Sequence, residues 1–273
     1  MSALHCENVT FHSSDEKHTS SAVIYTCPDV PVRAVIQLSH GMCEYVRRYA
    51  PMADFYAAHG IALAGNDHLG HGDTAQAGEH GHYGEKDGRF HLLDDLHTMN
   101  SLLHERFPGL PIILYGHSMG SFYARWYAEK WPESITALII SGTAGPSVMN
   151  AIGQRLAALI AAVKGNDAVS PLMVNLNFGS YCKRIPDAAS PNAWLSRDPV
   201  RPLGAAGSSL AAGQTRQFAD ADISLCGLPA RPAGDDRGRI QDLLRGRAAA
   251  VPGPHRHWQD NERAVPCPEI YGQ

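Results

Sequence analysis

Residues 111–120 read PIILYGHSMG, an apolar run followed at once by the pattern Gly-x-Ser-x-Gly. The apolar run is typical of a buried strand, and the residues after Gly120 favour a helix. Glycines two positions before and two positions after Ser118 remove the Cβ atoms that would clash where a strand and a helix meet closely. The stretch therefore predicts a sharp strand-turn-helix unit with Ser118 at the turn.

Ser118 is the candidate nucleophile of this unit. The five-residue pattern alone also fits a glycine-flanked serine that merely caps a helix. A serine hydroxyl is a weak nucleophile, so it must project from the backbone, meet a base and face donors for an oxyanion. A sharp turn between a buried strand and a helix meets the first requirement. The context thus favours a catalytic origin for Ser118, and its present use depends on a base.

Strand and helix patterns alternate outward from this unit. Strand-like runs are Glu7–Phe11, Ser21–Thr26, Arg33–Ser39, Ile61–Gly65 and Ile135–Ile140, and helix-like runs are Tyr45–His59 and Phe90–Phe107. The first two strands are separated by a polar turn and predict a hairpin. The remaining alternation predicts an α/β fold, with a mostly parallel sheet and helices on both faces. Functional sites in such sheets lie at the carboxyl ends of the strands.

Polar stretches follow two of the predicted strands. Residues 40–44 read HGMCE after one strand, and residues 66–72 read NDHLGHG after the next. The loop at residues 40–44 can supply one backbone N–H to an oxyanion, and the residue after the nucleophile can supply the other. These donors would belong to Met42 and Met119.

The second stretch admits a metal interpretation, because it holds Asp67, His68 and His71 within five residues. Its spacing matches no common zinc pattern, and its glycines indicate tight turns. We therefore expect Asp67 and His71 to hydrogen-bond the loop, and we expect neither a metal ion nor a cofactor.

The three motifs, in this order and at these intervals, resemble the monoacylglycerol lipase and lysophospholipase branch of the α/β-hydrolases. The resemblance covers about residues 5–198. It implies a serine hydrolase that cleaves a carboxylic ester, such as a monoacylglycerol or a lysophospholipid. It also implies Ser118 as the nucleophile and an oxyanion hole lined by Met42 and Met119.

The same resemblance predicts a hydrolase core (1–145) and a helical cap (146–198), and composition separates from them an atypical C-terminal region (199–273). Apolar residues recur at three- and four-residue steps in the cap between Val148 and Val163, so one helix face is apolar. That face fits either packing against the sheet or a lid with a groove for an acyl chain. A lid would contact a small lipid ester and, transiently, a membrane surface.

The α/β-hydrolase pattern requires an acid and then a histidine after the serine. Only His255 and His257 follow Ser118, so His257 is the predicted base, with His255 as its alternative. Asp235 is the predicted acid. The surrounding sequence departs from the pattern, because no apolar strand precedes either histidine and the interval from Asp235 to His257 is short.

Composition changes near Pro199. Residues 201–273 contain nine arginines and no lysine, and they are rich in Gly, Pro and Ala. Such a segment buries too little apolar surface to offset its ordering entropy, which predicts a poorly ordered tail. A second interpretation is a shift of the reading frame near this point in a G+C-rich gene, so that residues rich in Arg, Pro, Gly and Ala replace the genuine C-terminal third.

Charge and composition exclude other classes. The formal net charge is −4, so no basic field indicates a nucleic-acid partner. No apolar run reaches membrane-spanning length, and the first ten residues do not resemble a signal peptide, so we expect a cytoplasmic protein. The six cysteines form no Cys-x-x-Cys pair and are expected to be free thiols. The sequence indicates no oligomeric state.

Two main candidate functions and a third, less specific one follow. The first is a serine esterase or lipase that works through an acyl-enzyme at Ser118. The alternative is an impaired or inactive truncated hydrolase that retains at most hydrophobic ligand binding, since loss of the base removes most triad catalysis. A peptidase or acyltransferase on the same scaffold is a third candidate.

Overall fold

A computed structural model describes residues 4–42, 44–83, 87–145, 148–165, 168, 170–180, 183 and 185. All of these belong to one unit, residues 1–234. The predicted acid and base residues, and the whole C-terminal region 199–273, lie outside the described residues. The predicted region boundaries at 145 and 198 therefore stay predictions.

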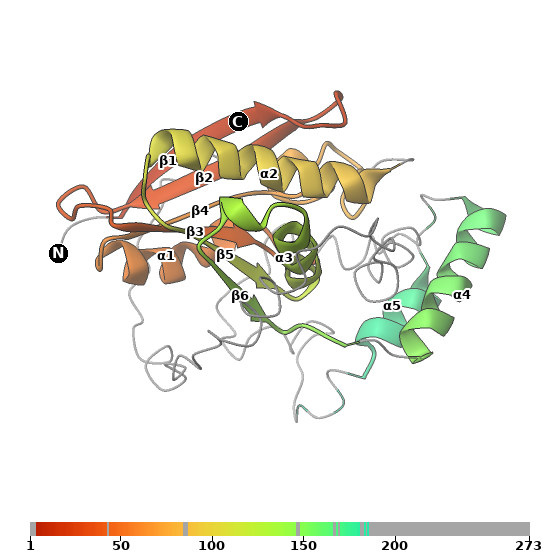
Figure 1. Cartoon of the computed structure of the whole chain (residues 1–273). Coiled ribbons are helices and arrows are strands. Elements are labelled where there is room, and N and C mark those ends of the chain that lie inside the picture. Colours follow the sequence, from red (N-terminus) through yellow and green to blue (C-terminus); the bar gives the residue numbers. More distant parts are fainter. Residues whose placement is uncertain are drawn as a thin grey trace, which may run out of the picture. The chain divides into compact units, whose positions relative to one another are not determined.

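Six described strands form one sheet (Figure 1). They are β1 (His5–His12), β2 (Thr19–Thr26), β3 (Ala34–Ser39), β4 (Ile61–Asn66), β5 (Ile112–His117) and β6 (Ala137–Ser141). Their order is β1-β2-β4-β3-β5-β6, with β2 antiparallel to β1 and β4, while β4, β3, β5 and β6 run parallel. The predicted hairpin and the predicted parallel sheet are both confirmed.

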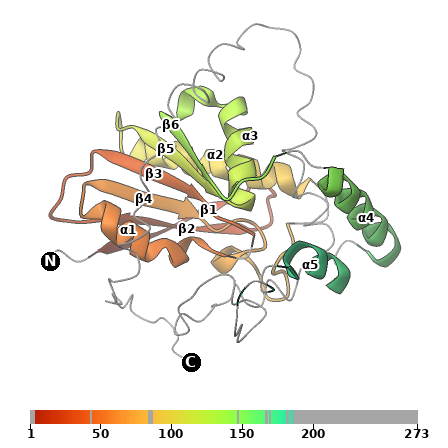
Figure 2. The same cartoon turned by 90° about the horizontal axis from the view of Figure 1, so that it is seen from below.

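Helices cover both faces of this sheet (Figure 2). They are α1 (Ala50–Ala57), which follows the short 3-10 helix η1 (Val46–Tyr49), α2 (Gly88–Arg106) and α3 (Met119–Lys130). In β2, Val23 and Tyr25 pack with α1, whereas Ala22 and Ile24 on the opposite face pack with α2. This alternation follows from the two-residue period of a strand and buries both faces.

Two further helices form the described part of the predicted cap. They are α4 (Val148–Lys164) and α5 (Pro171–Phe178), and the Ser170 hydroxyl accepts a hydrogen bond from the Met173 N–H at the start of α5. Ala157 of α4 and Met173 of α5 are buried together, with Met42 packed against them. Four apolar residues of α4 are 53–78% exposed: Val148, Ile152, Leu159 and Val163. Most of the apolar stripe of α4 is thus exposed. This differs from the interpretation in which the stripe packs against the sheet.

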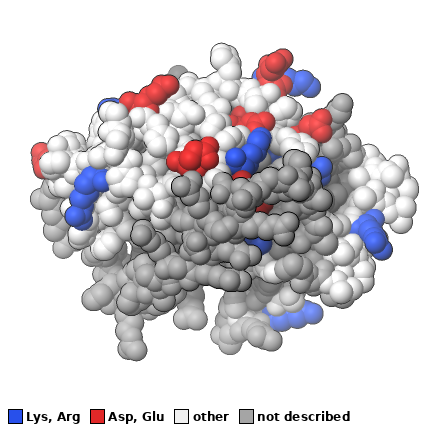
Figure 3. Space-filling model, in the orientation of Figure 1, with Lys and Arg blue, Asp and Glu red and all other residues white. Residues whose placement is uncertain are grey.

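Charged side chains are scattered over the face shown in Figure 3, where Lys and Arg alternate with Asp and Glu among the described residues. No described helix is both long enough and apolar enough to cross a membrane.

Candidate active site

Ser118 lies at the turn between β5 and α3, as the sequence predicts. Its backbone has φ 52° and ψ −119°, a region that residues with a side chain rarely occupy. Such a conformation costs on the order of 1–3 kcal/mol and persists only where the surrounding structure enforces it. The two flanking glycines allow the close packing that enforces it. A Cβ on Gly120 would lie 2.0 Å from the Ser39 carbonyl oxygen, and one on Gly116 would lie 2.6 Å from the Ala124 Cβ.

Hydrogen bonds to its backbone N–H and C=O hold Ser118 on both sides. Its N–H donates to the carbonyl of Ser141 at the end of β6, at 2.8 Å. Its carbonyl accepts from the Ser121 hydroxyl, at 2.6 Å. The turn is therefore fixed by the neighbouring strand and by the first turn of α3.

The loop after β3 approaches Ser118 closely, since a Cβ on Gly41 would lie 3.2 Å from the Ser118 Cβ. His40 Nδ1 donates to the Gly41 carbonyl at 2.8 Å, and the Gly41 N–H donates to Glu44 Oε1 at 2.6 Å. In a trans peptide the C=O and N–H point in opposite directions. The Met42 N–H therefore points away from the His40 ring.

Met42 and Met119 carry the two predicted oxyanion donors. Met119 is the first residue of α3, and a helix leaves its first N–H groups without intrahelical acceptors. The Met42 N–H has no acceptor within the described part of the chain. Both groups can thus donate to an oxygen of a bound substrate, which is the chemical requirement of an oxyanion hole.

Three buried histidines cluster at this loop: His40, which belongs to it, and His68 and His71. The His68 N–H donates to His40 Nε2 at 3.0 Å, and the two rings have centroids 4.1 Å apart. Burial is the main cause that lowers the pKa of His40, His68 and His71, and it lowers the pKa of His68 to about 3. At neutral pH, His40 and His68 therefore serve as uncharged hydrogen-bonding groups within the protein.

Asp67 connects the segments that follow the two polar stretches. Its Oδ1 accepts from the Val46 N–H at 2.7 Å, and its Oδ2 accepts from the Asp73 N–H at 2.9 Å. Burial raises the pKa of Asp67 to about 6, and these two hydrogen bonds oppose that shift. The predicted loop-supporting role of Asp67 is confirmed. In the described ranges, no three His, Cys, Asp or Glu side chains are arranged to hold a metal ion.

The sequence analysis did not identify two residues that contribute to the site, Glu44 and Tyr83. The carboxylate of Glu44 accepts from Gly41 N–H and also from the Tyr49 hydroxyl, at 2.7 Å. Tyr83 donates its hydroxyl to the Met119 sulfur, at 3.0 Å. A carboxylate three residues after a glycine in a strand-end loop was the available signal for Glu44. Tyr83 lies far from Met119 in the chain, and no local pattern indicates their contact.

The predicted catalytic residues are thus only partly brought together. Ser118, Met42 and Met119 lie at the carboxyl ends of β5 and β3. The predicted base, His257 or His255, and the predicted acid, Asp235, lie outside the described residues. The triad as a whole stays a prediction.

The sheet order, the strained serine between β5 and α3 and the facing strand-end loop are together those of an α/β-hydrolase. The chain belongs to the α/β-hydrolase family Hydrolase_4, described as serine aminopeptidase, S33, whose profile matches residues 30–216. This family includes serine ester hydrolases.

Two curated relatives are similar in sequence. A monoacylglycerol lipase of Mycolicibacterium smegmatis is 29% identical over 174 residues, which cover 63% of this chain and 54% of that protein. The monoglyceride lipase of Homo sapiens is 29% identical over 120 residues, which cover 42% of this chain and 37% of that protein. The chain thus spans about half, or less, of the length of these relatives.

Two solved structures are similar in fold. A thermostable carboxyl esterase from Bacillus coagulans, in complex with glycerol, has a TM-score of 0.68 and 27% identity, covering 80% of this chain and 72% of that one. A lipase in an open form has a TM-score of 0.65 and 24% identity, covering 81% and 73% respectively. The α/β-hydrolase fold expected from the sequence is confirmed.

Proposed function

We propose that this chain hydrolyses a carboxylic ester of a small lipid through an acyl-enzyme at Ser118. The observation that carries the proposal is the strained Ser118, which lies between the Met119 N–H at the start of α3 and the loop that carries the Met42 N–H. This arrangement fits nucleophilic attack on a carbonyl whose oxygen becomes negatively charged.

In the proposed reaction, Ser118 Oγ attacks the acyl carbonyl while a histidine takes the hydroxyl proton. The carbonyl oxygen becomes an oxyanion, which accepts from the N–H groups of Met42 and Met119. The ester C–O bond then breaks, and the histidine returns the proton to the departing alcohol. Water repeats the sequence on the acyl-enzyme and releases the acid. His257 or His255 as the base, and Asp235 as the residue that orients it, are part of the proposal.

We propose a monoacylglycerol as the preferred substrate and a lysophospholipid as the second choice. Support comes from the relatives named monoacylglycerol lipase and monoglyceride lipase, and from the esterase whose structure holds glycerol. The exposed apolar residues of α4 suit an acyl chain or a transient contact with a membrane surface. The relatives do not favour the inactive alternative.

The test is hydrolysis of a matched set of substrates by the purified full chain. The set contains 1-monoacylglycerols of several chain lengths, a lysophosphatidylcholine and an aminoacyl-p-nitroanilide, with release of product followed in each case. We expect turnover of the monoacylglycerols that Ser118→Ala abolishes. Turnover of the anilide alone would identify a peptidase, in line with the description of the family, and would contradict the proposed ester substrate.

A further inference from the structure

The loop between β4 and α2 contacts both residues that carry the predicted oxyanion donors. We name residues 67–83 the support loop. Two of its side chains, His71 and Tyr83, are 1% and 3% exposed, so neither is a surface residue. The proposed chemistry uses neither side chain.

His71 reaches the strand-end loop that carries Met42. Its Nε2 lies 2.5 Å from the Met42 carbonyl oxygen, and its Nδ1 lies 2.9 Å from the Leu69 carbonyl oxygen. Both partners are carbonyls, which only accept, and a neutral imidazole has a single N–H, so we place that N–H on Nε2, whose contact with Met42 is the shorter of the two. That bond fixes the carbonyl side of Met42, while His40 holds the Gly41–Met42 peptide group through the Gly41 carbonyl and Glu44 holds the His40–Gly41 peptide group through the Gly41 N–H.

Tyr83 reaches the other donor residue. Its hydroxyl donates to the Met119 sulfur at 3.0 Å, and the Met119 side chain is 2% exposed. Met119 begins α3, and its buried side chain belongs to the cluster that packs the start of that helix against α2 and β5. A bond to its sulfur therefore helps to fix the direction of its N–H.

The two contacts belong to one packed unit. The rings of His71 and Tyr83 stack with centroids 6.1 Å apart and planes inclined by 24°. The Gly81 N–H donates to the Gly70 carbonyl at 2.8 Å, which closes the loop at its base. Gly88 also lies against Tyr83, since a Cβ there would be 2.2 Å from the Tyr83 carbonyl oxygen.

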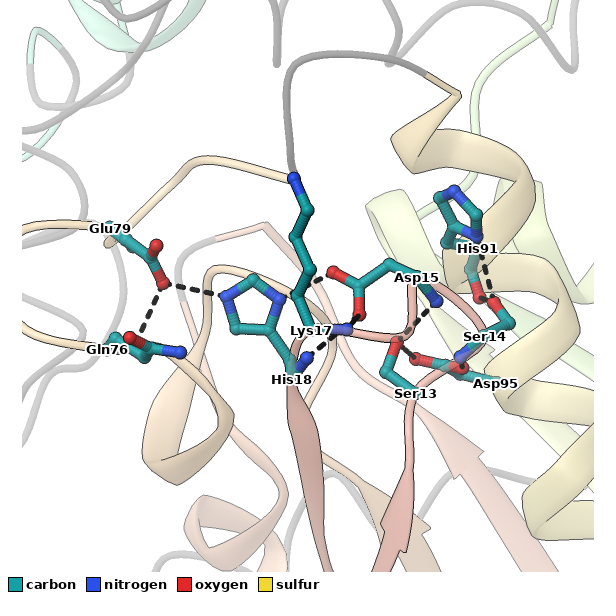
Figure 4. Close-up of polar contacts among 9 residues, drawn as sticks. All are labelled: Ser13, Ser14, Asp15, Lys17, His18, Gln76, Glu79, His91 and Asp95. Atoms are coloured by element: carbon teal, nitrogen blue, oxygen red, sulfur yellow. Dashed lines mark hydrogen bonds and ion pairs between the residues drawn. The ribbon is translucent and has the colours of Figure 1, made fainter.

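The outer part of the support loop is anchored to the β1–β2 turn (Figure 4). His18 lies between two carboxylates, with Nε2 2.9 Å from Glu79 Oε2 and Nδ1 2.5 Å from Asp15 Oδ2. The loop is thus held at both its inner and outer ends. It can serve as a rigid base for the residues it contacts.

We propose that His71 and Tyr83 are positioning residues for the hydrolysis, because they hold Met42 and Met119 so that both backbone N–H groups face the same oxyanion. This inference rests on the proposed function. Donors of this kind act only when they are aimed at the oxygen of the transition state, so a small loss of alignment lowers kcat more than it raises KM.

The experiment measures kcat and KM for the best monoacylglycerol with three variants of the full chain. Tyr83→Phe removes only the hydroxyl. His71→Gln places an amide near the position of Nε2 and can still donate to the Met42 carbonyl, whereas His71→Asn places it near Nδ1 and cannot. We expect kcat to fall about 3- to 10-fold in Tyr83→Phe and about tenfold in His71→Asn, with KM nearly unchanged and His71→Gln close to wild type.

Two controls separate positioning from general stability. Tyr127→Phe removes another hydroxyl from the same buried cluster, one that contacts Ser134 and His97 instead of Met119. We expect its kcat to match that of the wild type. In a Met119→Leu background the sulfur is absent, so Tyr83→Phe should cause no further loss.

The outcomes distinguish the two proposals. If the wild type is active and Tyr83→Phe and His71→Asn keep full kcat, the positioning role is wrong and the proposed function stands. The positioning role also fails if His71→Gln loses as much as His71→Asn. If the wild type shows no turnover of any ester, the proposed function is overturned, and this inference falls with it.

Discussion

Helices α2 and α4 carry the same kind of apolar stripe and have opposite surroundings. In α2 the stripe is fully buried, with Leu92, Leu93, Leu96 and Leu103 each 0% exposed. In α4 the stripe is mostly exposed, with Leu159 at 62% and Val163 at 76%. A periodic pattern thus predicts that a helix has an apolar face and leaves open what covers that face.

The two stripes differ because of their neighbours. The α2 stripe meets a sheet whose alternate residues also point toward it, so both surfaces are removed from water. The α4 helix meets α5 and Met42 through a small cluster around Ala157. We therefore assign the α2 stripe to stability, and we propose that the α4 stripe serves binding.

The largest expected effect is in α2. Leu96→Ala should lower the free energy of unfolding by about 2–5 kcal/mol, because it leaves a cavity in the buried cluster. Leu159→Ala in α4 is the matched control, and its cost should stay within about 0.5 kcal/mol because the side chain is already exposed. Urea unfolding measures the free energy of unfolding of both variants. Equal losses in the two variants would break the distinction between the two helices.

A pair of glycines sharpens the same comparison. Gly88→Ala at the start of α2 should cost about 1–3 kcal/mol, since the new Cβ would collide with the Tyr83 backbone. Gly153→Ala inside α4 should stabilise by about 0.5–1 kcal/mol, because a Cβ there meets nothing within 4 Å and alanine favours the helix. Thermal unfolding shows whether each substitution raises or lowers the stability of the chain. If Gly88→Ala stabilised the chain, the close packing of the start of α2 against Tyr83 would be wrong.

The smallest expected effect concerns pH and the outer anchor of the support loop. Burial alone would lower the pKa of His18, but hydrogen bonds to Asp15 and Glu79 outweigh it and raise that pKa. A raised pKa in the folded state means that the stabilisation is complete below the unfolded value of about 6.5 and is lost as pH rises through the folded value. The stability difference between wild type and His18→Asn should therefore shrink between pH 5.5 and pH 9. A difference that grows with pH would contradict the proposed ion pairs.

Much of this fold could be predicted from sequence because its signals are local. The apolar run at 111–115 and the glycines around Ser118 predicted the β5–α3 turn, and Gly60 predicted the end of the α1 region. The order of the strands could not be predicted, because pairing between β2 and β4 depends on the packing of the whole sheet. The predicted boundaries of most elements were within a few residues of those observed.

The candidate site was predicted less completely. Positions 42 and 119 follow from the motif, since backbone donors depend on place in the chain and not on side-chain type. Glu44, His40 and Tyr83 act through contacts with backbone or with distant side chains, which exist only once the loops have their final shape. Neither the base nor the acid is tested by the described residues, so the central claim rests on Ser118.

The most direct test of that claim is labelling of the purified full chain with a fluorophosphonate probe, with Ser118→Ala as the control. A phosphonate bonds rapidly only to a serine that a base has activated, so the test needs no knowledge of the substrate. The account predicts rapid labelling of the wild type and none of the variant. A folded wild-type sample that stays unlabelled, or labelling that persists in Ser118→Ala, would contradict it.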